Sequence, residues 1–499
     1  MHAPHEAIWI MIVSALLCPM VSSGRAEADP FPQYAVIRPN VSFWIDIYSR
    51  YPTTQAVVHD SLHLNIVYET IDLEPVSQID AREINRGRME QATNRRKQVL
   101  RRLAADPRTQ DAECRRVAAL FAPGANARTF ALASHRVRCQ IGQRDRFQDG
   151  LIRSGAYLQQ IRSILQSHGV PEALAFLPHV ESSFDIDANS KFGAAGMWQF
   201  TRSTGRRFMT VDHILDERRD PIAATHAAAQ LLRENYDKLG SWPLAITAYN
   251  HGAAGMQRAQ AAHGDYPSIF TAYRGRSFKF ASRNFYAEFL AARQVASDYE
   301  RYFGVLSLKK PERLRSVHLE AFAAFEDLCR HFKISPERGR ELNPALGSAV
   351  FNGQKYVPMG YRFRLSDSVE SGPPISFDLP RRICKTTQKP SQFYTVQPGD
   401  TAGKIARMHQ VALNDLILAN CLNRRATVYA RQTLRIPQPG DSVASPKSDP
   451  HPIPESTAVQ KAPADSLERP ITDFGFSPIV QSSLTIPADE RVMEERPDT

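Results

Sequence analysis

The sequence predicts a mainly α-helical protein of several domains, with small α+β modules toward its C-terminal end. Its 499 residues exceed what one hydrophobic core usually organises. Hydrophobic residues make up 42% and charged residues 23%, a balance that excludes collagen-like, coiled-coil and wholly disordered chains. Strand patterns are nearly absent between residues 145 and 302, where proline and glycine mark the ends of helices.

The first residues are typical of an exported protein. Residues 7–21 are apolar, which is too short for a comfortable membrane span and suits the core of a signal peptide. Small residues follow, so we expect a signal peptide over residues 1–26 and a location in the periplasm or cell envelope. Outer-membrane association stays open, although Leu17 disfavours lipid attachment at Cys18. A buried N-terminal helix is the alternative.

Charge narrows the choice of partner. The formal net charge is +10, but residues 439–499 hold five Lys/Arg and eleven Asp/Glu, so the rest of the chain carries +16. A basic body could bind nucleic acid, yet the sequence has no zinc finger, RNP-type aromatic motif or Lys/Arg-rich helix. We therefore expect no nucleic acid partner and favour an anionic polymer of the cell envelope.

Cysteine and histidine spacing argues against a metal or cofactor. No pair of cysteines forms C-x-x-C, which excludes zinc ribbons and thioredoxin chemistry. His179, His226 and His251 lie in separate predicted helices without ligand spacing. In an oxidising compartment we expect Cys114 and Cys139 to form a disulfide.

Helices with clear start and stop signals fill the central region. Pro171 opens one segment, and Asp220 before Pro221 is typical of a helix N-cap with proline in the first turn. Gly240 is expected to end that helix, and Pro243 to open the next.

A carboxylate is expected on an apolar helix face in this region. Leu174, Leu177 and Glu181 stand at i, i+3 and i+7, so one face carries two leucines and a carboxylate. A carboxylate in apolar surroundings is costly unless it is paired or kept neutral by a raised pKa. A neutral carboxyl is what a general acid needs, although a helix-end Glu bonded to the backbone fits the same spacing.

Two further segments place polar side chains beside glycines. Residues 193–199 (GAAGMWQ) put two glycines where the backbone must pass close to something, followed by Met197, Trp198 and Gln199. An apolar surface with an amide suits a sugar ring, while packing of Trp198 in a core is the default interpretation. Residues 248–252 (AYNHG) offer a phenol and an amide at a helix end.

These three segments resemble the soluble lytic transglycosylase family, whose catalytic domains have a lysozyme-like all-α fold. That family shows a catalytic Glu followed by Ser, then G-A-x-G-x-x-Q, then A-Y-N-x-G, in the order found here. The resemblance implies a catalytic Glu181, whose carboxylate Ser182 would orient, and no cofactor. It also implies that the substrate is held by the following residues: Ser182, Met197, Gln199, Tyr249 and Asn250. A fourth family segment is only approximated by residues 282–286, to which we assign no role.

A second resemblance lies near the C-terminal end. Residues 394–401 (YTVQPGDT) predict a strand and turn, followed by two helices and a closing strand that ends at Pro437. This βααβ pattern is similar to the LysM domain, which implies binding to glycans that contain N-acetylglucosamine. Residues 308–367 repeat the outline weakly, with a helix expected over 319–332, and we interpret them as a degenerate LysM-like unit.

The predicted domain order combines these assignments. It comprises a signal peptide (1–26), a helical N-terminal scaffold (27–140), a lysozyme-like transglycosylase domain (141–303), a degenerate LysM-like unit (308–367), a linker (371–391), a LysM domain (392–438) and a disordered acidic tail (439–499).

The resemblances imply a peptidoglycan lytic transglycosylase that LysM anchors to the cell wall. It would cleave the β-1,4 bond between N-acetylmuramic acid and N-acetylglucosamine and leave 1,6-anhydromuramic ends. Glu181 would act first as acid and then as base, since the three motifs hold no second acidic residue. The alternatives are a lysozyme-type muramidase and a non-catalytic peptidoglycan-binding protein, and His179 is a rival for the acid. The oligomeric state stays open.

Overall fold

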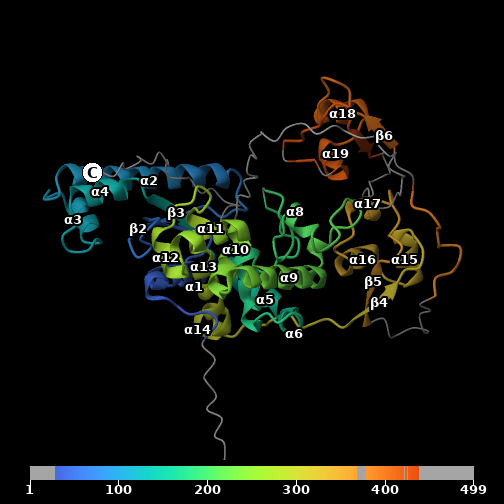
Figure 1. The fold of residues 1–499 in the computed structure, drawn as a ribbon, viewed down its shortest axis with the longest axis horizontal. Helices are drawn as coiled ribbons and strands as arrows, with labels where there is room; N and C mark the ends of the chain where they lie inside the picture. Colours follow the sequence, from blue (N-terminus) through green and yellow to red (C-terminus); the bar gives the residue numbers. More distant parts are fainter. Residues whose placement is uncertain are drawn as a thin grey trace, which may run out of the picture.

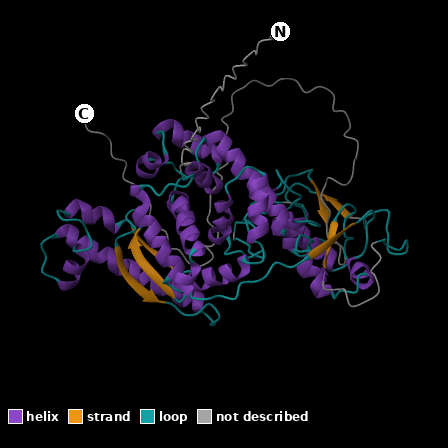
Figure 2. Cartoon of the chain, turned by 90° about the horizontal axis from the view of Figure 1, so that it is seen from below, coloured by secondary structure: helices purple, strands orange, loops and turns teal. Residues whose placement is uncertain are grey.

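The computed structural model describes residues 29–190, 192–367, 378–389, 392–420, 422–423 and 425–437. The chain is mainly helical, as expected, and its strands lie toward the two ends of the molecule (Figure 2). The expected signal peptide, the tail over 439–499 and residues 371–377 and 390–391 of the expected linker lie outside the described residues. Within the described ranges, none of the helices combines the length and apolarity that crossing a membrane requires.

The largest hydrophobic core belongs to the central helices. Its elements are α5 (Arg144–Ser154), α6 (Leu158–Ser167), η2 (Glu172–Phe176), α7 (Leu177–Glu181), α8 (Arg202–Gly205), η3 (Glu217–Arg219), α9 (Pro221–Leu239), α10 (Trp242–His251), α11 (Ala253–His263), α12 (Tyr266–Ala272), α13 (Phe280–Ser297) and α14 (Tyr299–Phe303). The predicted helix signals are confirmed: Asp220 caps α9, and Gly240 ends it in the left-handed conformation.

The first described residues belong to this same core. Helix α1 (Arg38–Ser49), which follows the 3₁₀ turn η1 (Ala35–Ile37), packs against α13. The Asn40 amide donates to the Asn284 side-chain oxygen over 2.7 Å, and the Tyr286 hydroxyl donates to the carbonyl of Pro32 over 3.0 Å. Residues 29–49 are therefore part of the central helical body, although the sequence analysis assigns them to the N-terminal scaffold of residues 27–140.

Residues 55–141 form a smaller body that is not purely helical. An antiparallel sheet in the order β2-β1-β3 packs with three helices around its own core. The elements are β1 (Gln55–Asp60), β2 (Val67–Asp72), β3 (Val137–Ile141), α2 (Ala81–Ala105), α3 (Ala112–Ala118) and α4 (Ala127–Ser134). The prediction missed this sheet because central strand β1 is buried on both faces and shows no alternation. The expected disulfide is also wrong: Cys114 and Cys139 are separate buried thiols.

The unit after the central helices is built as strand, helices and strand. Its elements are β4 (Leu314–His318), α15 (Phe325–His331), α16 (Pro336–Leu342), α17 (Ser348–Phe351) and β5 (Arg362–Ser366), and β4 pairs antiparallel with β5. The helix expected from residue 319 begins only at Phe325. Residues 319–323 are not helical, because Leu319 donates to the Tyr361 carbonyl and Ala323 pairs with Val357.

The last described module confirms the predicted βααβ unit. It comprises β6 (Gln392–Thr395), α18 (Ala402–Met408), α19 (Leu413–Ala419) and β7 (Thr433–Ile436), with β6 antiparallel to β7. After its second helix, the Asn420 side chain accepts from the Arg435 N–H over 2.6 Å and donates to the Arg435 carbonyl over 2.8 Å. Asn343 makes the same two bonds with Arg364 in the preceding unit, at 2.8 and 3.1 Å. The two modules therefore share this pair of asparagine hydrogen bonds as well as the order of their helices and strands.

The unit over 314–366 is docked on the central helical body (Figure 1). Gly347 donates its N–H to the Ile214 carbonyl, and Asp216 donates to the Ala345 carbonyl, both over 2.7 Å. Ile214 is also part of the unit's hydrophobic core. Backbone hydrogen bonds and shared apolar packing together fix the position of this unit against the helices.

Candidate active site

Glu181 is the last residue of α7 and its side chain is only 3% exposed. The segment before it is not the single α-helix that the sequence predicts, because residues 172–176 wind as a 3₁₀ helix before α7 begins. Leu174 and Leu177 are nonetheless fully buried. The expected apolar surroundings of the carboxyl are therefore present, built from two short helical pieces.

A tight turn follows Glu181 and is held by α5. Ser183 and Phe184 both have positive φ angles, 52° and 59°. This left-handed backbone conformation costs free energy for residues other than glycine. The Arg153 guanidinium donates to the Ser183 carbonyl over 2.8 and 3.1 Å. A Cβ atom on Gly150 would lie 2.9 Å from Ser183, so α5 approaches the turn closely only because residue 150 is glycine. Helix α5 thus holds the chain in the conformation that ends α7 at Glu181.

Ser182 connects the first motif to the second. Its hydroxyl donates to the Met197 carbonyl over 2.8 Å. This bond differs from the expectation that Ser182 orients the catalytic carboxylate directly. Met197 is 1% exposed and Trp198 is fully buried, with its indole N–H bonded to Thr225. These two side chains pack inside the domain, so the default interpretation of Trp198 as a core residue is confirmed and the alternative of an apolar surface for a sugar ring is not.

The loop of the second motif depends on a glycine and a buried arginine. Gly196 has a φ of 76°, and a Cβ atom there would lie 1.8 Å from the Arg218 carbonyl oxygen. The close backbone approach expected from the sequence is therefore present at Gly196. The Arg218 guanidinium donates to the carbonyls of Gly193 and Phe200 over 2.8 and 3.0 Å. One side chain, itself paired with Asp216, thus supports both ends of the loop.

Gln199 is buried with one polar atom left over. Its amide nitrogen donates to the carbonyls of Gly196, over 2.7 Å, and Ala188, over 3.3 Å. Its side-chain oxygen has no hydrogen-bond partner in the described part of the chain. A buried acceptor without a partner is destabilising unless something else supplies a donor. Gln199 can therefore accept a hydrogen bond from a bound molecule.

The third motif lies at the end of α10. The Tyr249 hydroxyl donates to the Trp198 carbonyl over 2.8 Å, which joins this motif to the second. The Asn250 side-chain oxygen accepts from Ser282 over 2.8 Å, while its amide nitrogen has no partner among the residues described. Asn250 thus offers a buried donor, complementary to the acceptor on Gln199.

A second buried carboxylate, which the sequence analysis did not identify, influences Glu181. Burial, and then the charge of Glu288 on α13, raise the pKa of Glu181 well above its usual value. Glu288 is 1% exposed. Burial and the charges of both carboxylates also raise the pKa of Tyr48, and burial and Glu181 raise that of Tyr249. Glu181 therefore holds its proton to a higher pH than an exposed glutamate does.

His179 does not fit the rival role of acid. Its ring lies among aromatic side chains, with centroids 4.7 Å from Phe147 and 4.6 Å from Phe184. Neither ring nitrogen has a hydrogen-bond partner within the described residues. Burial, followed by the charge of Arg153, lowers its pKa to about 3. His179 is therefore a neutral core residue that has no proton to donate near neutral pH.

Comparison with known proteins identifies two domains. Residues 160–269 match the transglycosylase SLT domain, and residues 394–437 match the LysM domain. Both matches fall inside the regions where the sequence resembles these families. The chain therefore contains a transglycosylase SLT domain followed by a LysM domain.

Part of this chain is also similar in sequence to curated proteins. Proteins named membrane-bound lytic murein transglycosylase D from Escherichia coli (strain K12) and Escherichia coli O6:H1 are each 29% identical over 284 residues. These alignments cover 54% of this chain and 60% of each relative, so the chain spans about three fifths of the curated relatives. An Alteromonas sp. (strain M-1) protein named for tributyltin chloride resistance is 33% identical over 111 residues, 21% of this chain and 53% of that protein.

Sequence reasoning missed the partners that lie outside the three motifs. Glu288 and Ser282 come from α13, which includes the segment left without a role, and Tyr48 comes from α1. The weak match to the fourth family segment was the available signal for α13. No group of His, Cys, Asp and Glu in the described part of the chain is arranged to hold a metal ion.

Proposed function

We propose that this chain is a peptidoglycan lytic transglycosylase of the cell envelope. The observation that carries the proposal is the buried carboxyl of Glu181, with its raised pKa, in the segment that hydrogen bonds tie to the other two motifs. A carboxyl whose pKa is raised keeps its proton to a higher pH, which suits it to protonate a leaving group. The names of the E. coli relatives support the same activity and an envelope location.

In the proposed mechanism Glu181 acts twice. As an acid it gives its proton to the glycosidic oxygen while the bond to the muramyl C1 breaks. As the resulting carboxylate it takes the proton of the muramyl C6 hydroxyl, whose oxygen then bonds to C1 and closes the 1,6-anhydro ring. The raised pKa favours the first step, and the residue returns to its protonated form in the second.

Gln199 and Asn250 are the proposed substrate-binding groups. One has a buried acceptor and the other a buried donor without partners among the described residues. An N-acetyl group presents one N–H donor and one carbonyl acceptor, which is the complementary pair. Tyr249, bonded to Trp198, would support this region beside Glu181. We assign Met197 no contact with substrate through its side chain, since that side chain is buried in the core.

The C-terminal modules would bring the enzyme to its substrate. We propose that the LysM domain binds glycans that contain N-acetylglucosamine and anchors the chain to the wall. The unit over 308–367 is, in this proposal, a degenerate LysM-like unit, supported by its element order and by the matched bonds of Asn343 and Asn420. Because this unit is hydrogen-bonded to the SLT domain, we propose that it forms part of the same rigid body as the catalytic helices.

The second candidate is a lysozyme-type muramidase, which Glu288 favours. Ordinary glycosidases use two carboxyl groups, one as acid and the other as base or nucleophile. Glu288 supplies a second carboxylate whose charge acts on Glu181. We assign Glu288 the role of raising the pKa of Glu181, because its charge has that effect and it lies on α13, outside the three motifs.

Digestion of sacculi in oxygen-18-labelled water separates the two candidates. A transglycosylase forms its product within the sugar, so the released muropeptides should carry 1,6-anhydro ends without labelled oxygen. A muramidase adds one water at each cleavage, so its products should carry the label at a reducing end. Binding to sacculi without any released product would support the non-catalytic alternative.

A further inference from the structure

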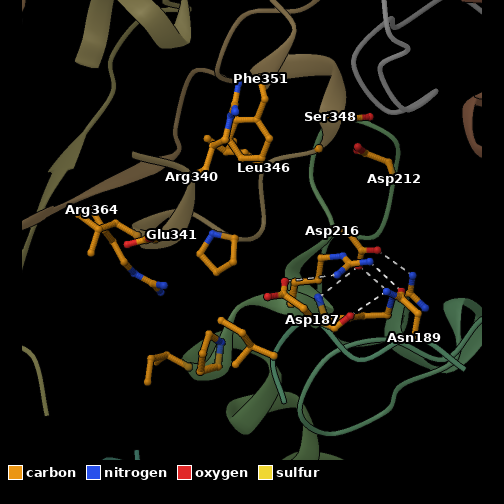
Figure 3. A pocket seen from close by; sticks show the side chains of 18 of the residues that line it. Asp187, Asn189, Asp212, Asp216, Arg340, Glu341, Leu346, Ser348, Phe351 and Arg364 are labelled. Atoms are coloured by element: carbon orange, nitrogen blue, oxygen red, sulfur yellow. Dashed lines mark hydrogen bonds and ion pairs between the residues drawn. The ribbon is translucent and has the colours of Figure 1, made fainter. Parts of the chain in front are cut away.

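A large basic cavity lies between the SLT domain and the unit over 314–366. Its volume is about 2370 Å³, and Glu181 is not among its lining residues. One wall includes Asp187 and Asn189 from the loop before the second motif, and the opposite wall includes Arg340 and Phe351 (Figure 3). Residues of α19 in the LysM domain form a further side. Three parts of the chain therefore meet around one space.

The lining is strongly cationic. Eleven Lys and Arg side chains line the cavity, against five Asp and Glu side chains. Several of these arginines form ion pairs with acidic side chains, such as Arg218 with Asp216 and Arg364 with Asp220. Four cations have no ion-pair partner within the described residues, namely Lys309, Lys310, Arg340 and Arg362. They come from α16, from β5 and from the connecting segment, where Lys309 donates its backbone N–H to the Ile152 carbonyl of α5.

The size of the cavity and its charge define the kind of ligand. Pockets for drug-sized molecules usually measure about 300–1,000 Å³, so this cavity fits a segment of a polymer better than a small metabolite. Unpaired guanidinium and ammonium groups bind carboxylates and phosphates. The Arg340 guanidinium also lies 5.5 Å from the ring of Phe351, so an apolar surface adjoins the charge.

The cavity is joined to the candidate active site by one short segment. Asp187 and Asn189 line the cavity, while Ala188 between them accepts hydrogen bonds from Gly196 and from the Gln199 amide. A ligand in the cavity therefore lies beside the loop that carries Gln199. A polymer chain bound at Glu181 could therefore place a side branch in the cavity.

We propose that this cavity binds the carboxylate-bearing peptide stems of peptidoglycan while the glycan lies at Glu181. The inference rests on the proposed function, because it takes peptidoglycan as the substrate. Peptide stems carry free carboxylates on a flexible chain, which matches uncommitted cations beside an apolar ring. Because α19 of the LysM domain lines the same cavity, a glycan bound by the LysM domain would lie close to the glycan that is cleaved at Glu181.

The test measures binding without cleavage. In a Glu181→Gln background, fluorescence anisotropy would compare two labelled probes: a glycan fragment with its peptide stems and the same glycan after an amidase has removed them. The test variant combines Lys309→Gln, Lys310→Gln, Arg340→Gln and Arg362→Gln. The control removes four charges from α2 and the loop after it, with Arg82→Gln, Lys97→Gln, Arg101→Gln and Arg108→Gln.

The expected result is a selective loss. The test variant should bind the probe with stems at least about tenfold more weakly, which corresponds to ~1.4 kcal/mol, and bind the stripped probe as the parent does. The charge control should leave both affinities within about twofold of the parent. Equal losses for both probes, or no loss, would overturn the proposal, as would tighter binding of polyphosphate than of the probe with stems. Failure of the parent to cleave sacculi would overturn the proposed function alone, since this assay needs no turnover.

Discussion

The hydroxyl of Ser182 donates a 2.8 Å hydrogen bond to the carbonyl oxygen of Met197. This bond joins the residue that follows Glu181, the proposed catalytic residue, to the loop that carries Gln199. Both residues are buried, at 6% and 1% exposure, so water does not readily replace the bond. The relative position of Glu181 and Gln199 therefore depends on it.

Replacement of Ser182 by alanine should loosen this connection. We expect a loss of about 1 kcal/mol in the free energy of unfolding and a fall of about tenfold in kcat, because the buried Met197 carbonyl loses its donor. Urea unfolding and sacculus turnover would measure the two effects. Ser167→Ala is the matched control, since that hydroxyl bonds the Ile164 carbonyl over 2.8 Å in α6. Equal losses of kcat in both variants would contradict the positioning role.

The buried carboxyl of Glu181 should make stability depend on pH. Its raised pKa means that the folded protein keeps this proton to a higher pH than the unfolded chain. Stability is therefore lost as the pH rises above about 4.3, the usual value, toward the folded pKa. Glu181→Gln should stabilise the protein at neutral pH, and the gain should vanish near pH ~4. Urea midpoints across this range would show it, with the exposed Glu90→Gln as a control; a gain that is constant with pH would contradict the raised pKa.

The pH dependence of kcat/KM should report the same proton. The alkaline limb follows ionisation of Glu181 in the free enzyme, and Glu288 raises that pKa. Glu288→Gln should shift the limb to lower pH, while the neighbouring Tyr48 and Tyr249, whose own pKa values are raised, stay neutral.

His179→Gln provides the contrast in the same experiment. The limb should persist there, because burial keeps His179 neutral with a pKa of about 3. A limb that disappears in His179→Gln while Glu181 is intact would reassign the acid. A limb that does not move in Glu288→Gln would show that Glu288 has no electrostatic influence on Glu181.

Removal of the LysM domain should separate anchoring from catalysis. The cut belongs after Lys389, because Gln388 exchanges hydrogen bonds with the backbone of Tyr356 and so belongs to the preceding unit. The truncated chain should bind sacculi markedly less in a pull-down and still cleave soluble glycan fragments. Unchanged sacculus binding would show that the LysM domain is not the anchor.

The sequence predicted those features of the fold that local chemistry determines. Asp220 and Gly240 define the ends of α9, and Thr401 caps α18, because capping depends on residues a few positions apart. Residues 319–323 were predicted as helix and are not helical, because backbone groups of this segment bond residues that come much later in the chain. Such tertiary pairing overrides helix propensity and leaves no local signal.

The same distinction applies to the candidate site. Glu181 could be identified from its motif, but Glu288 could not. Glu288 lies on a helix that is distant in sequence, and only the fold brings its charge close enough to raise the pKa of Glu181. Arg218 was missed for a similar reason: its bonds to Gly193 and Phe200 depend on the path of the chain between η3 and the second motif. The burial of Met197 and Trp198 also follows from packing against neighbouring helices, which spacing alone does not show.

Mass analysis of the products that Glu181→Gln releases from sacculi tests the central claim most directly. The amide keeps the shape of the side chain but can neither give the proton nor take it back. Because general acid–base groups typically contribute about 10²–10⁴-fold, release of 1,6-anhydro muropeptides should fall by at least about a hundredfold while the variant stays folded. Release of the same anhydro products within about tenfold of the parent rate would contradict the assignment of Glu181 as the catalytic acid and base.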